Sequence, residues 1–156
     1  MRFVMHPVTL AVVAAAVIGY TQWTVPDRTL NSDSVEVTGI ASSVAEASAT
    51  FTPQDPTASI DRATQMMSPE SAERFKADFA TVAKDLGGRN VSAQASTVSA
   101  GVEAIGPEAA RVGGVLRGTQ SSPGQPTDSA VLALRVSLSK TDGRWLVEDV
   151  SPLHSR

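Results

Sequence analysis

Few side chains in this sequence of 156 residues could act as nucleophiles or general bases. It has no cysteine and two histidines, His6 in an uncharged N-terminal stretch and His154 near the C-terminus. Neither histidine is placed for a nucleophile–base pair, and no thiolate can replace one. We interpret His6 as an interfacial residue and His154 as part of a solvated tail. The sequence therefore predicts no catalytic residues and a protein that is not an enzyme.

Metal and cofactor chemistry is also weakly represented. No acidic pair has the spacing of a calcium loop with its glycine, and the lack of cysteine excludes thiolate zinc sites. Gly113-Gly114 lies in a strand-like run, without the lysine or helix of a phosphate-binding loop. Glu148-Asp149 is interpreted as the exposed edge of a last strand. We predict no cofactor, no cofactor-binding residues and no metal ligands.

The charge balance excludes one class of partner. The chain carries 13 basic and 16 acidic residues, a formal net charge of −3. A nucleic-acid-binding protein would present a basic face, so we expect no nucleic-acid partner. Without its uncharged N-terminal stretch the chain retains about 130 residues, enough for one core but not for two.

The N-terminal stretch has the properties of a membrane anchor. Arg2 is the only charged residue before Asp27, and Tyr20 and Trp23 follow the apolar run. As a helix, residues 3–23 would span about 31 Å, close to the thickness of the hydrocarbon core. Aromatic rings favour the interface, and a basic residue marks the inside end. We predict a signal anchor over 1–26, with a cytoplasmic N-terminus and an extracytoplasmic domain.

Two alternatives to an uncleaved anchor remain open. A small-residue site before Tyr20 would fit a cleaved signal peptide, which would release the domain. An apolar cytosolic helix is the other alternative. After the anchor we predict a hinge over 27–32, an extracytoplasmic domain over 33–153 and a tail over 154–156.

The first half of the predicted domain has helical periodicity. An amphipathic helix of about 16 residues is marked by apolar residues at helical spacing, namely Val37, Ile40, Val44, Ala47 and Phe51. Pro53 and Pro56 break it, and a shorter helix follows over about 57–66. Ser68, before Pro69, is the clearest helix cap, and Gly87-Gly88 supply a stop for a third helix over 69–86.

The second half alternates apolar and polar residues, as strands do. The alternation covers about 91–102 with a change of phase near Thr97, then 110–118, 132–139 and, after the Asp142-Gly143 turn, 144–147. The change of phase is typical of a bulge or bend. Trp145 is interpreted as a structural residue of the core, and Met66-Met67 as gap-filling core. The fold class is α+β, with three helices packed on a curved four-stranded antiparallel sheet.

The order of these elements resembles a known family. The pieces that carry the resemblance are the N-terminal anchor, the run from Phe51 to Pro56, MSPESAERF (67–75) and LRVSLSKTDGRWLVEDVSPL (134–153). Together they resemble the mammalian-cell-entry (Mce)-associated membrane proteins of actinobacteria, and the DGRWLV hairpin (142–147) is the most specific piece. The resemblance implies a cone-shaped fold similar to nuclear transport factor 2. It also implies residence in the cell envelope beside Mce transporters that import lipids or sterols.

The resemblance defines the leading functional hypothesis. We expect a non-enzymatic, membrane-anchored accessory or stabilising subunit whose partners are Mce transporter subunits or other envelope proteins. One alternative is an assembly factor resembling the inner-membrane subunit of type IV secretion machines. Another is a cone-fold protein that binds a small apolar ligand, such as a lipid, between the helices and the sheet. We expect strands two and three to be short and aromatics are sparse, which disfavours a lipid-lined pocket.

Overall fold

The computed structural model describes residues 28–153. The predicted signal anchor over 1–26, with His6, and the tail over 154–156, with His154, lie outside the described residues. Within 28–153, no helix combines the length and the apolar character that crossing a membrane requires. The compact unit that holds the core begins at Ser32.

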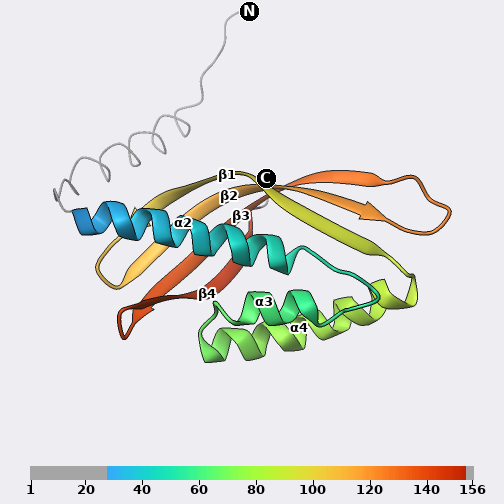
Figure 1. Ribbon diagram of the computed structural model, residues 1–156, viewed down its shortest axis with the longest axis horizontal. Coiled ribbons are helices and arrows are strands. Elements are labelled where there is room, and N and C mark those ends of the chain that lie inside the picture. Colours follow the sequence, from blue (N-terminus) through green and yellow to red (C-terminus); the bar gives the residue numbers. More distant parts are fainter. Residues whose placement is uncertain (1–27, 154–156) are drawn as a thin grey trace, which may run out of the picture. The chain divides into compact units, whose positions relative to one another are not determined.

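Three helices precede four strands along the described chain. In order they are α2 (Arg28–Ser48), α3 (Ala58–Thr64), α4 (Pro69–Gly88), β1 (Ser92–Ile105), β2 (Ala109–Ser121), β3 (Asp128–Thr141) and β4 (Arg144–Pro152). The strands form one antiparallel sheet in the order β1-β2-β3-β4, and the helices lie on one side of it (Figure 1). The predicted class, with three helices on a four-stranded antiparallel sheet, is confirmed.

The first described helix differs from the prediction at both ends. It begins at Arg28, so the segment expected as a hinge over 27–32 is helical from that residue onward, and the boundary between the two compact units lies within it, after Asn31. Nothing between 28 and 32 breaks a helix, since neither proline nor glycine occurs there. At the other end, Ser48 Oγ and Thr50 Oγ1 donate to the carbonyls of Ala45 and Glu46 and compete with helical hydrogen bonds. The helix therefore ends before Phe51.

The stop of α4 also lies later than predicted. Gly87 and Gly88 remain helical, and the left-handed residue is Asn90, with φ 52°. The N–H of Asn90 donates to the carbonyl of Gly87, and the N–H of Val91 donates to that of Leu86. This pair of bonds is a Schellman motif, in which asparagine tolerates the left-handed conformation. At its start, Ser68 caps the helix as predicted.

The core lies between α2 and the concave face of the sheet. Its fully buried side chains come from both layers and include Val37, Val44, Val112, Leu116, Val136 and Val147. Strands β2 and β3 have 13 and 14 residues, so the prediction that they are short is wrong. Their outer ends were missed because side chains there are exposed, and many are polar. The predicted change of phase in β1 is a bulge between Thr97 and Ser99.

The tryptophan of the predicted hairpin is part of this core. Trp145 is 3% exposed, as predicted for a structural residue, and Met67 is buried as well. Lys140 Nζ lies 5.2 Å from the centre of the tryptophan ring and 3.0 Å from Asp33 Oδ2. This part-buried pair ties the first turns of α2 to the β3–β4 hairpin.

Single-residue bridges attach the chain between the helices to both outer strands. The backbone of Phe51, which follows α2, exchanges two hydrogen bonds of 2.8 and 2.9 Å with Ala93 in β1. On the opposite edge, Val147 of β4 donates to the carbonyl of Met66 at 2.8 Å and accepts from the N–H of Ser68 at 2.9 Å. The segments that flank α3 thus partly cover both edges of the sheet.

We expect Phe51→Ala to lower the free energy of unfolding by about 3–5 kcal/mol. The ring is 2% exposed and lies 6.2 Å from that of Phe79, so truncation leaves a cavity beneath the bridge. Urea unfolding of the purified full-length chain, followed by circular dichroism, measures the loss. Val82→Ala is the control, because Val82 is 51% exposed on α4 and should change stability by less than about 0.5 kcal/mol. Equal losses in the two variants would show that Phe51 does not anchor this edge.

Candidate interaction groove

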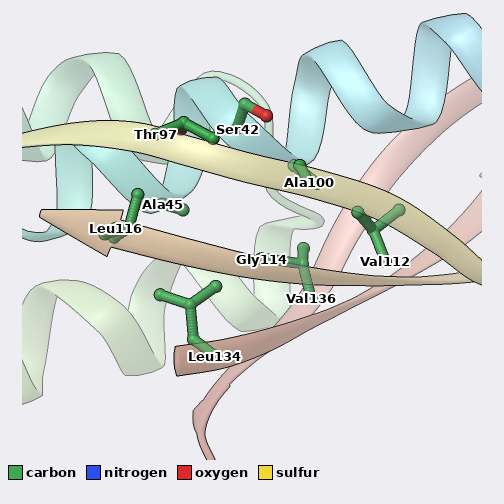
Figure 2. A pocket seen from close by; sticks show the side chains of 10 residues that line it. Ser42, Ala45, Thr97, Ala100, Val112, Gly114, Leu116, Leu134 and Val136 are labelled. Carbon is green, nitrogen blue, oxygen red and sulfur yellow. The ribbon is translucent and has the colours of Figure 1, made fainter. Parts of the chain in front are cut away.

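The interior of the fold is filled. The hollow between α2 and the sheet is lined by small and aliphatic side chains, among them Ala45, Leu116, Leu134 and Val136 (Figure 2). Its volume is about 10 Å³, at the lower limit for a single water molecule. Within the described residues this hollow therefore has no room for a lipid or another apolar ligand.

A larger depression lies between α4 and β4. Its volume is about 250 Å³. One face of α4 contributes residues at a spacing of three and four, namely Ser71, Arg74, Phe75 and Asp78. The other wall is a continuous stretch of β4, namely Val147, Glu148, Asp149 and Val150. We call this depression, completed by Met67 and Ser48, the α4–β4 groove.

A bulge in β4 orients the central residue of the groove. Leu138 pairs with Val147 and Ser137 pairs with Asp149, so Glu148 is an extra residue without a partner in β3. A bulge of this kind locally changes the direction in which a side chain points. Here the carboxylate lies beside the first turn of α4 and beside β3, where hydroxyl groups surround it.

Three serines hold Glu148 in place. Ser68 Oγ donates to Oε2 at 2.7 Å, Ser139 Oγ donates to Oε1 at 2.5 Å, and Ser71 Oγ donates to the backbone carbonyl of Glu148 at 2.6 Å. The hydrogen bonds from Ser139 and then Ser68 lower the pKa of the Glu148 carboxyl, and the charge of Arg74 adds a smaller effect. The carboxylate is therefore ionised at neutral pH and already occupied as an acceptor, which makes it a poor general base.

The remaining groups of the groove suit binding rather than bond-making. Arg74 donates to Ser71 Oγ at 3.2 Å and to the carbonyl of Glu148 at 3.4 Å. Within residues 28–153, no three histidine, cysteine or acidic side chains are placed to hold a metal ion. The groove combines an apolar floor with a charged rim, the usual anatomy of a surface that recognises a protein segment.

Sequence reasoning missed this cluster. It interpreted Glu148-Asp149 as an exposed strand edge, whereas Glu148 is half-buried and only Asp149 is exposed. The serines that bond to Glu148 are up to 80 residues away in the chain, so no local pattern joins them. The sequence offered one indication of this cluster. The helix-capping Ser68 is followed about one turn later by a second serine, Ser71.

We expect Glu148→Gln to destabilise the protein by about 1–2 kcal/mol at neutral pH, because the serine hydroxyls lose a charged acceptor. The pKa of Glu148 is lowered in the folded state. Its stabilising contribution is therefore present above the unfolded pKa, about 4.3, and is lost as the pH falls through the lower folded pKa. The gap between wild type and variant should shrink in strong acid. Urea unfolding at neutral and acidic pH measures both values.

The matched control for this variant is Glu103→Gln. Glu103 forms a solvent-exposed ion pair with Arg135, in which Oε2 lies 2.7 Å from Nε. We expect its loss to cost less than about 1 kcal/mol. If Glu148→Gln were as mild as this control, or equally damaging at every pH, the serine network would not depend on a charged acceptor.

Comparison with known proteins relates the fold to solved structures. No family model matches the chain, and no curated protein matches it. An IcmL-like type IV secretion system protein from Legionella pneumophila aligns with a TM-score of 0.63 and 11% identity, over 84% of this chain and 96% of that one. The periplasmic domain of DotI aligns at 0.64 with 9% identity, over 76% and 94%. VirB8 from Agrobacterium tumefaciens aligns at 0.60 with 10% identity, over 77% and 92%. The chain is similar to these proteins in its fold, which is of the nuclear transport factor 2 type.

Proposed function

We propose that this chain is a non-catalytic accessory or assembly subunit of a cell-envelope complex, similar in role to the inner-membrane subunits of type IV secretion machines. The observation that carries the proposal is the match to a type IV secretion protein over nearly the whole length of that structure. The chemistry of the groove supports it, since Glu148 and Arg74 are engaged in structural hydrogen bonds. The small hollow beneath α2 also disfavours the alternative of an apolar ligand.

The proposed location is the outer side of a membrane. In this arrangement, residues 1–26 anchor the chain with a cytoplasmic N-terminus, and the described domain is extracytoplasmic. The part of DotI that shares this fold is a periplasmic domain, and the periplasm is on the side of the membrane that the sequence predicts here. An anchor would confine the domain to a thin layer and raise its effective concentration toward neighbouring envelope proteins.

Membership of the Mce-associated family is the second candidate. Its support is the sequence resemblance itself, which lies mainly in the two segments 67–75 and 134–153. They meet in the structure, because Met67 bridges to Val147 and Ser68 bonds to Glu148. In this function the chain would stabilise a lipid importer, and its partners would be Mce transporter subunits.

We expect a cysteine at position 131 to be accessible from outside the cell. The chain has no cysteine, and Val131 is 67% exposed in β3, so Val131→Cys provides one reactive thiol. A membrane-impermeant maleimide added to whole cells should label it, while Arg2→Cys should react only after the membrane is opened. Labelling of Arg2→Cys with protection of Val131→Cys would reverse the proposed topology.

We expect photo-crosslinking in native membranes to capture envelope proteins. A photoreactive amino acid replaces Val35, Val98 or Val131, which are exposed on different elements. Mass spectrometry of the adducts then separates the two candidates, because secretion-channel components support the first and Mce transporter subunits support the second. Recovery of no envelope protein from any of the three positions would contradict both.

A further inference from the structure

The outer edge of β4 is partly open beside the groove. Val147 is covered by the bridge described above. Farther along, the N–H of Leu153 donates to the carbonyl of Ala133 at 2.7 Å. Because alternate residues face opposite edges, Val150 directs its N–H and carbonyl away from β3. No backbone group of the described chain pairs with it there, and Pro152, which lacks an N–H, closes the edge.

The size and floor of the groove limit what could bind. Val147 and Met67 are buried beneath it, and Phe75 and Val150 are partly exposed to it. Its volume is about 250 Å³. Sites for small-molecule ligands usually measure about 300–1,000 Å³. The groove is therefore smaller than most small-molecule sites, and its size suits one or two side chains of a protein segment.

The rim carries three acidic side chains and one basic side chain, Arg74. Glu148 is occupied by serine hydroxyls, and Arg74 donates to Ser71 and to the carbonyl of Glu148. Asp78 on α4 and Asp149 on β4 are both exposed, and neither forms an ion pair with a described residue. Asp149 Oδ2 accepts one hydrogen bond, from Ser151 Oγ. Two exposed carboxylates without an ion-pair partner, one on each wall, favour a cationic group in the partner.

We propose that the α4–β4 groove binds a short extended segment of a partner protein, with an apolar side chain on Phe75 and Val150 and a lysine or arginine beside it. The open edge at Val150 selects an extended segment, because a helix has no free backbone groups to pair with it. The carboxylates of Asp78 and Asp149 select the cation. This inference rests on the proposed function, which requires contacts with other proteins, and it names the site and the chemistry of one contact.

Selection from a random phage-displayed peptide library on the full-length protein in detergent tests the proposal. Enriched peptides should carry lysine or arginine next to an aliphatic or aromatic residue. A synthetic copy of the strongest binder should lose about tenfold in affinity for the Asp78→Asn, Asp149→Asn variant at low salt, since each exposed pair contributes up to about fivefold. Glu36→Gln removes an exposed carboxylate of α2 and should leave the affinity unchanged.

Charge reversal provides the second measurement. With Asp78→Lys and Asp149→Lys, selection should enrich acidic peptides instead. Enriched peptides without a charge preference, or equal affinity for wild type and the double asparagine variant, would overturn the proposal. If photo-crosslinking captures envelope proteins while the groove variants have no effect on peptide binding, the proposed function stands and this inference falls. If peptides bind to the groove but photo-crosslinking captures no envelope protein, this inference stands and the proposed function falls.

Discussion

The attachment of the helical layer to both edges of the sheet is the constraint on which the other features depend. A four-stranded sheet has two outer strands with unpaired backbone groups, and each invites pairing with another chain. Here the segment after α2 pairs with β1 through Phe51, and the segment before α4 pairs with β4 through Met67. Because these bridges stand at opposite edges, α4 must run from the β4 side back to the start of β1, which it reaches at Val91.

That path brings the first turn of α4 against β4 and explains the serine cluster. Ser68 is both the cap of the helix and a bridging residue, so its hydroxyl lies beside β4. The bulge at Glu148 supplies the matching acceptor. A second irregularity lies in β1, where Glu103 reaches Arg135 across β2. Gly113 leaves the space for that pair, because a Cβ there would lie 2.7 Å from Glu103 Oε1.

The hollow between α2 and the sheet is too small for a ligand, so a binding site is expected on the surface. Similar folds carry many unrelated functions, so the site and not the fold must identify an activity. Small residues such as Ala41 and Ala45 allow α2 to lie close to the sheet, and aliphatic side chains of β2 and β3 fill the space beneath it. Within residues 28–153, the α4–β4 groove combines an apolar floor, an open strand edge and exposed carboxylates.

The sequence alone determined the fold class, because its signals are local. Alternation of apolar and polar residues marks a strand, a serine before a proline marks a helix start, and the change of phase near Thr97 marks a bulge. These patterns also placed Trp145 in the core. Where local signals were weak, they gave the wrong ends for two helices. The first helix begins at Arg28, within the expected hinge. The third helix runs through Gly88, and Asn90 takes the left-handed conformation that was expected of a glycine.

Only the tertiary structure decided where the candidate site is. Asp78 and Asp149 belong to elements about 70 residues apart in sequence, and both line the groove because α4 packs beside β4, where Met67 pairs with Val147. The environment of Glu148 depends on hydroxyls from a helix cap and from a neighbouring strand. Hydrogen bonds between residues so far apart have no period and no fixed spacing, so they leave no pattern in the sequence. Packing creates them, and with them the groove.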